Sequence, residues 1–106
     1  MIQVNFNPKE MMLEVTGHAD YAENGKDIVC AAMSILFYQL ADSLTKSVNM
    51  LEEYPDIKIL GGECKISCKP MEKYSANIEN IYWVVLNGVE LLADNYAENT
   101  KFCVVG

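Results

Sequence analysis

The chain opens with two short segments in which apolar and polar residues alternate. Ile2–Phe6 and Met11–Val15 each carry an apolar residue at every second position, and the turn-forming residues Asn7–Glu10 lie between them. Because successive side chains on a strand point to opposite faces, this pattern predicts an opening β-hairpin with one buried face. A second hairpin is predicted around Gly61-Gly62, a dipeptide that suits the positive φ angles of a tight turn. The remaining predicted strands are Ile57–Leu60, Cys64–Cys68 and, near the end of the chain, Phe102–Val105.

Two longer stretches repeat apolar residues at three- and four-residue spacing, the period of a helix with one buried face. The first begins behind Asp27, a residue type favoured as a helix N-cap, and is predicted to run to about Asn49. The second is predicted over Ser75–Tyr96. The element order is then ββαββαβ, which predicts an α+β fold with two helices packed on a mixed or antiparallel sheet.

Trp83, Val84 and Leu91 lie beside the main apolar stripe of the second helix. One interpretation is that a helix of this length has a wide buried stripe. The other is a contact in a homodimer, because two layers leave one sheet face without cover and large apolar patches are rare on monomers. The pattern alone leaves both interpretations open.

The length and the apolar runs limit the architecture. At 106 residues the chain is predicted to form a single domain over residues 1–106. No run approaches the roughly 20 uninterrupted apolar residues that a membrane span needs. The N-terminus also lacks the basic and apolar regions of a signal peptide. We therefore expect a cytoplasmic protein with no membrane partner.

The charge balance argues against nucleic-acid binding. The chain has eight lysines, no arginine and fifteen acidic residues, which gives a net charge of −7. A nucleic-acid binder usually shows a basic face on which arginine reads phosphates and bases. A basic protein partner suits this surface better than a nucleic acid does.

The four cysteines are expected to be free thiols, because the chain has no export signal. A structural zinc site would need ligands paired at short spacing, whereas only Cys64 and Cys68 are close together and the sole histidine is distant. No metal or other cofactor is expected. Cys64, Cys68 and Cys103 fall in strand patterns, where a thiol usually serves as a small packed side chain.

A candidate chemical centre lies where a polar loop, Thr16–Lys26, meets the first helix. If Asp27 is the N-cap, Cys30 lies in the first turn, where the helix dipole favours a thiolate over a thiol. The loop carries His18, and an imidazole beside a thiolate is the usual way to activate a cysteine nucleophile. Ser34 follows one helical turn after Cys30 on the same side. Spacing alone does not distinguish this centre from a packed cysteine and a solvated histidine.

The residues around this centre resemble a family signature. The pattern is Gly-His-Ala, a spacer, Gly-x-Asp, two aliphatic residues and Cys-Ala-Ala-x-Ser. It is matched here by Gly17-His18-Ala19, Gly25 and Asp27-Ile28-Val29-Cys30-Ala31-Ala32-Met33-Ser34. On these residues the chain resembles the ribosomal-processing cysteine protease family Prp. One departure is Met33, where a smaller aliphatic residue is more usual.

The resemblance implies a peptidase that removes an N-terminal extension from the large-subunit ribosomal protein twenty-seven. It also implies that the enzyme is a homodimer. His18 matches the catalytic histidine and Cys30 the nucleophile, while Asp27 and Ser34 match accompanying polar positions. Gly17 and Gly25 match glycines that bracket a loop thought to move over the substrate.

The catalytic interpretation leads to two structural expectations. Backbone N–H groups at the helix start, including that of Cys30, are candidates for the oxyanion hole. The loop between the two glycines has few apolar side chains, so we expect it to be loosely held and ordered by substrate. The alternative function is a non-enzymatic ribosome-assembly factor that holds a ribosomal-protein tail. A thiol oxidoreductase is disfavoured because Cys30 lacks a CxxC partner.

Overall fold

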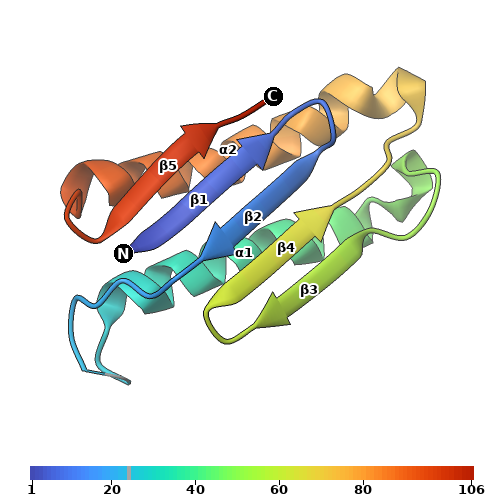
Figure 1. The fold of residues 1–106 in the computed structure, drawn as a ribbon. Helices are drawn as coiled ribbons and strands as arrows, with labels where there is room; N and C mark the ends of the chain where they lie inside the picture. The colour runs from blue at the N-terminus through green and yellow to red at the C-terminus, as the bar shows by residue number, and fades with distance from the viewer. Residues whose placement is uncertain (24) are drawn as a thin grey trace.

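A computed structural model describes residues 1–23 and 25–106, and these residues form the predicted ββαββαβ order (Figure 1). Five strands build one sheet, and two long helices cover one of its faces. Short 3₁₀ turns at Val48–Met50 and Glu72–Tyr74 complete the framework. The elements are β1 (Ile2–Asn7), β2 (Met12–Thr16), α1 (Ile28–Lys46), β3 (Asp56–Leu60), β4 (Glu63–Ser67), α2 (Ser75–Asn95) and β5 (Thr100–Val104).

The sheet is mixed, with the strand order β3-β4-β2-β1-β5. The two hairpins pair side by side through β2 and β4, and all of their strand pairs are antiparallel. After α2 the chain returns as β5, which pairs parallel to β1 with Ile2 opposite Thr100. This pairing brings the turn between α2 and β5 close to the N-terminus.

The core lies between the sheet and the helices. Inward strand residues such as Phe6 and Leu13 are fully buried, as the alternating pattern predicts. The ring of Tyr82 stacks on Phe6 at 5.2 Å between centroids, and its hydroxyl donates a 2.7 Å hydrogen bond to the Met11 carbonyl. The burial of this aromatic side chain is therefore combined with a satisfied polar group.

The open face of the sheet is polar. One row of paired residues crosses it through Lys58, Lys65, Glu14, Asn5 and Cys103. Such a face is compatible with water, so the expectation that it needs an apolar cover is wrong.

The flank residues of α2 do not all fit one interpretation, because one is packed against the core and two are exposed. Trp83 packs edge-on against Phe6 at 5.3 Å and donates a hydrogen bond to Glu79, so it belongs to the wide packed stripe. Val84 and Leu91 are 60% and 55% exposed. Of the three flank residues, only these two remain for an interface.

Element boundaries differ from the predictions by a few residues. α1 ends at Lys46 rather than near Asn49, because the chain tightens there into the 3₁₀ turn Val48–Met50. β2 begins at Met12 because Met11 adopts a left-handed backbone with φ +47° in the hairpin turn, although its side chain is buried. β5 begins two residues earlier than predicted, at Thr100.

α1 has the length and apolar composition of a membrane-spanning helix. Its packing accounts for part of that composition, although Ile28 and Ile35 are exposed. Val29, Met33, Phe37, Leu40 and Leu44 recur at helical spacing and are buried in the core.

Candidate active site

The start of α1 is organised by the carboxylate of Asp27. Asp27 has an extended backbone, and its Oδ1 accepts hydrogen bonds from the N–H groups of Val29 and Cys30, both at 3.0 Å. These N–H groups would otherwise lack partners at a helix start. The predicted N-cap is confirmed, and it places Cys30 in the first helical turn with its side chain half-buried.

The same carboxylate ties the preceding loop to the helix. Asp27 Oδ2 accepts from the N–H groups of Tyr21 at 3.0 Å and Ala22 at 3.4 Å. The hydrogen bond from the Cys30 N–H, and then those from the two loop residues, hold the pKa of Asp27 below its usual value. Asp27 is therefore an anion at neutral pH, and its carboxylate accepts hydrogen bonds from both the helix start and the loop.

A loop N–H points at the candidate nucleophile. Ala19 is only 1% exposed, and its backbone N–H lies 3.4 Å from Cys30 Sγ, in hydrogen-bonding geometry. A donor in this position stabilises negative charge on sulfur, and the positive end of the α1 dipole acts in the same direction. A loop N–H and a helix start thus meet at the Cys30 sulfur.

His18 is held against the β3–β4 turn. The Gly17 N–H donates a 2.9 Å hydrogen bond to the Gly62 carbonyl. A methyl group built on Gly62 would lie 2.9 Å from His18 Nε2, so the imidazole packs directly on this glycine. Gly62 also has φ +77°, a backbone region that glycine adopts without strain.

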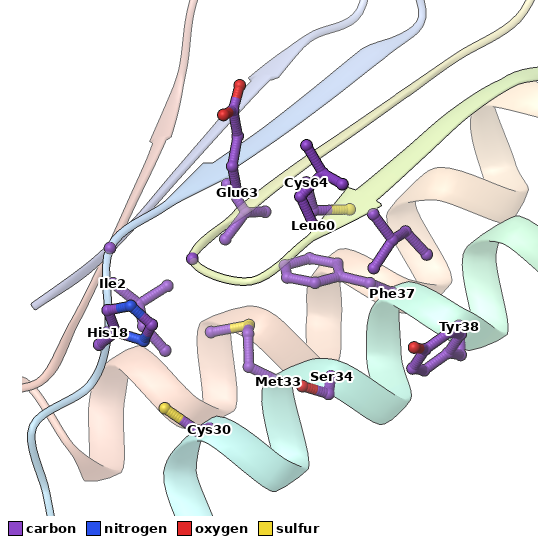
Figure 2. A pocket seen from close by; sticks show the side chains of 14 residues that line it. Ile2, His18, Cys30, Met33, Ser34, Phe37, Tyr38, Leu60, Glu63 and Cys64 are labelled. Atoms are coloured by element: carbon purple, nitrogen blue, oxygen red, sulfur yellow. The ribbon is translucent and has the colours of Figure 1, made fainter. Parts of the chain in front are cut away.

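His18 and Cys30 line the same pocket and lie at the same end of it (Figure 2). Among the hydrogen bonds of the described residues, none joins the imidazole to the thiol. The structure therefore brings the two side chains to one cavity without pairing them directly. Catalytic hydrogen bonds are often absent in a ligand-free site and form with substrate.

The pocket is an apolar slot of about 170 Å³ between α1 and the β3–β4 hairpin. Ser34 and the exposed ring of Tyr38 belong to its α1 side. A second hollow continues past Cys30 along the loop and includes Asp20 and Asp27. The apolar walls of the first pocket are Ile2, Val15, Met33, Phe37, Ile59, Leu60 and Cys64.

The structure gathers the residues that the signature singled out. His18, Cys30 and Ser34 line both hollows, whereas Asp27 lines only the second. Gly17 and Gly25 have φ values of +91° and +86°, as expected for loop glycines. A side chain at Gly17 would collide with the carbonyl oxygen of Met1, whereas one at Gly25 would meet open space.

Residues 19–22 of the loop make more fixed contacts than their composition suggests. Besides the bonds to Asp27 and Cys30, Asn99 Nδ2 donates to the Ala19 carbonyl at 2.8 Å. The Tyr21 ring packs edge-on against Tyr96 at 5.4 Å between centroids. Asn24, which belongs to the same predicted loop, lies outside the described residues. Movement of this loop on substrate binding stays a prediction.

The proposed use of the Cys30 N–H in an oxyanion hole is not supported. That N–H already donates to Asp27, and so does the N–H of Val29. Capping and oxyanion binding compete for the same donors, and the cap occupies them in this structure. The Ala19 N–H is the donor that faces the sulfur.

The other cysteines differ from Cys30 in their surroundings. Burial raises the pKa of Cys64 to about 11, and it also raises the pKa of Cys68. Both are packed, as predicted, although Cys64 reaches the pocket wall. Cys103 is half-exposed, in the polar row on the open face of the sheet. Within residues 1–23 and 25–106, no three His, Cys, Asp or Glu side chains cluster as metal ligands would.

Two contacts of the site could not be predicted from the sequence. Gly62 was identified only as a turn residue, and nothing in the sequence connects Asn99 with the loop, 80 residues earlier. Both act by packing or hydrogen bonding across the fold. Neither carries a chemical signal of its own.

Comparisons with known proteins identify the family of the chain. Residues 1–101 match the family model described as Cysteine protease Prp. A Staphylococcus aureus (strain Mu50) protein named ribosomal processing cysteine protease Prp is 26% identical over 100 residues, which are 94% of this chain and 92% of the relative.

Two crystal structures of the S. aureus essential ribosomal processing protease Prp share the fold. One, in complex with a covalently linked product peptide, has a TM-score of 0.81 at 24% identity. The other, in complex with a substrate peptide, has a TM-score of 0.74 at 22% identity. Each alignment covers 99% of this chain and 100% of the crystallised one. The extent of the family match settles the assignment: the chain belongs to the cysteine protease Prp family and is a cysteine-type peptidase.

Proposed function

We propose that Cys30 and His18 are the catalytic dyad of an endopeptidase that removes the N-terminal extension of the large-subunit ribosomal protein twenty-seven. The observation that carries this proposal is the donor–sulfur contact at the start of α1. Cys30 Sγ accepts a hydrogen bond from the Ala19 N–H at 3.4 Å, and Cys30 lines the same pocket as His18, the only histidine of the chain. The S. aureus relative is named as a ribosomal processing protease, which supports the class of substrate.

The reaction proceeds in two displacements. The Cys30 thiolate attacks the scissile carbonyl carbon and forms a C–S bond, and the carbonyl electrons move onto oxygen. The Ala19 N–H, beside the sulfur, is the candidate donor to that oxyanion. When the intermediate collapses, the C–N bond breaks and the His18 imidazolium gives its proton to the leaving amine. His18 then takes a proton from water, which attacks the acyl-enzyme and releases the thiolate.

Asp27 and Ser34 are proposed as supporting residues. Asp27 holds both the helix start and the loop, so it keeps Cys30 and Ala19 together. Ser34 lines both hollows beside Cys30, where its hydroxyl faces the path of a peptide. Gly17 and Gly25 are proposed as the hinges of the loop that carries His18.

The pocket suits an apolar segment of substrate. Its walls include the aromatic ring of Phe37 and the side chains of Met33 and Leu60. An aromatic or large aliphatic side chain of the substrate would therefore be buried there. The second hollow lies on the other side of Cys30, which leaves room for the chain that follows the cleaved bond. The net charge of −7 favours the basic body of a ribosomal protein.

We further propose that the enzyme acts in the cytoplasm, as one domain over residues 1–106, and as a homodimer. Ile35 and Leu91 line a shallow apolar groove between α1 and α2 and are 65% and 55% exposed, which supports an interface there. In sedimentation, Leu91→Glu should dissociate the dimer, whereas the exposed loop substitution Tyr54→Ser should not. A monomeric parent protein would contradict the dimer.

The decisive experiment is incubation with the full-length precursor, read by mass spectrometry. A single cut that removes the N-terminal extension is expected from the parent protein and not from Cys30→Ala. The alternative is a non-enzymatic ribosomal-protein-binding factor, which would retain the precursor uncut with either protein. Binding without cleavage by the parent protein would overturn the proposed peptidase reaction for this substrate.

A further inference from the structure

Asn99 contacts the active-site loop from the far end of the chain. It lies in the turn between α2 and β5, and its Nδ2 donates a 2.8 Å hydrogen bond to the Ala19 carbonyl. Ala19 is the buried residue whose own N–H points at Cys30 Sγ. One side chain thus lies two hydrogen bonds from the candidate nucleophile.

Asn99 is itself firmly placed by its backbone. Its N–H donates to the Tyr96 carbonyl at 2.9 Å, and its carbonyl accepts from the Ile2 N–H at 2.8 Å. These bonds join the C-terminal end of α2 to the beginning of β1. The side chain is half-buried and therefore has a fixed support on the rigid part of the fold.

The bond from Asn99 constrains the conformation of residue 19. It orients the peptide between Ala19 and Asp20, and Asp20 has a left-handed backbone with φ +54°. Such a conformation persists in a non-glycine residue when its surroundings hold it. The preceding peptide supplies the N–H that faces Cys30. Without the amide of Asn99, the Ala19 carbonyl loses this donor, and residue 19 is free to rotate its N–H away from the sulfur.

We propose that Asn99 is a positioning residue, which holds Ala19 so that the Ala19 N–H stays hydrogen-bonded to the Cys30 sulfur. This inference rests on the proposed function, since it takes Cys30 as the nucleophile. Asn99 touches neither the thiol nor the pocket, and its effect passes through the backbone of residue 19.

The test compares Asn99→Ala with Asn95→Ala in a Cys103→Ser background, which removes the other partly exposed thiol. Asn95 is a matched control because its Nδ2 also donates to a backbone carbonyl, that of Leu91 at 2.7 Å, at the same end of α2 but away from the loop. Iodoacetamide labelling of Cys30 is followed by mass spectrometry from pH 5 to pH 9.

Asn99→Ala should slow alkylation at pH 7 by about three- to tenfold and move its rise to higher pH, because a hydrogen bond to the charged sulfur is lost. The kcat for precursor cleavage should fall by a similar factor while KM changes little. Asn95→Ala should match the parent in both assays. Asn99→Asp, which keeps the size but has no donor at neutral pH, should behave like Asn99→Ala.

The outcomes separate this inference from the proposed function. A folded Asn99→Ala protein with parental alkylation and cleavage would overturn the role of Asn99 alone. Parental cleavage by Cys30→Ala would instead overturn the proposed function. If both Asn99 variants lose the fold while Asn95→Ala keeps it, Asn99 is a residue of the fold, and the positioning role is overturned as well.

Discussion

The two halves of the active site are held in different ways. Cys30 is placed by α1 and its cap Asp27, three residues earlier in the chain. The loop that carries His18 is placed by groups distant in sequence, namely the Met1 backbone against Gly17, Gly62 against the imidazole and Asn99 on Ala19. The nucleophile therefore depends on local structure, whereas the geometry of its partner depends on the assembled sheet.

This difference has a consequence for how the site fails. A helix start capped by a carboxylate forms whenever α1 packs, so Cys30 should tolerate distant perturbation. The His18 loop meets the helix only where the β3–β4 turn and the α2–β5 turn both reach it. Small shifts of either turn should therefore reduce catalysis before they reduce stability.

The largest effect is expected from removing the nucleophile itself. Cys30→Ala should lower precursor cleavage on the order of 10³-fold or more, because no other group takes over the covalent step. The fold should persist, since alanine favours helix and Asp27 still caps it. Thermal unfolding followed by circular dichroism checks the fold. Cys103→Ser, on the open face of the sheet, is the control that should cleave normally.

Removing the histidine should be almost as damaging. His18→Ala takes away the group that protonates the leaving amine, so cleavage should approach that of Cys30→Ala. Members of one catalytic unit are not additive, so the double variant should be no slower than Cys30→Ala alone. Two defects that multiply in steady-state kinetics would argue against a dyad.

The support of His18 can be tested without touching either catalytic residue. Gly62→Ala should lower kcat roughly ten- to hundredfold, because the new methyl group displaces the imidazole by a few tenths of an ångström or more. Gly61→Ala is the control for a methyl group added to this turn, since a side chain there meets open space, although it lacks the left-handed backbone of Gly62.

NMR gives a direct readout of that displacement, because His18 is the only histidine in the chain. Its ring-proton shift should change in Gly62→Ala and not in Gly61→Ala. An unchanged shift in a folded but slow Gly62→Ala protein would mean that the turn acts by another route.

Replacing the cap residue Asp27 should have a smaller effect on cleavage and a pH-dependent effect on stability. Because its hydrogen bonds lower the pKa of Asp27 beneath the usual 3.8, Asp27 stabilises the fold above that value and loses this contribution as the pH falls below it. Between pH 5 and pH 2 the unfolding temperature of Asp27→Asn should therefore decrease less steeply than that of the parent. At pH 7 its cleavage should fall about threefold, since Asn keeps a cap oxygen but not the charge. Parallel pH profiles of the two proteins would contradict this role.

The smallest effect concerns the second thiol of the pocket. With its pKa raised to about 11, only about one Cys64 thiol in a thousand is ionised at pH 8. Iodoacetamide should thus modify Cys30 many times faster than Cys64, as quantified by peptide mapping. Rapid labelling of Cys64 in the native protein would mean that the pocket opens further than its packing implies.

Much of this arrangement was accessible from the sequence because it is local. Period-2 and period-3.6 patterns predicted every strand and both helices, with errors of a few residues where 3₁₀ turns or a left-handed Met11 end an element. Asp27 three residues before Cys30 predicted a capped thiol, since capping involves only neighbouring residues. The signature around His18 and Cys30 predicted the family, which the comparison over residues 1–101 shows.

Only the tertiary structure decided what surrounds those residues. From the sequence we expected the Cys30 N–H in the oxyanion hole and few fixed contacts for the loop, but the cap uses that N–H, and Asn99 reaches the loop across 80 residues. Gly61-Gly62 predicted a turn, yet nothing in the dipeptide indicated that Gly62 would be the surface on which His18 rests. Such contacts arise between segments brought together by sheet pairing, and short-range patterns carry no information about them. The sequence determined which groups are present and how each helix begins, while the strand order determined which of them meet.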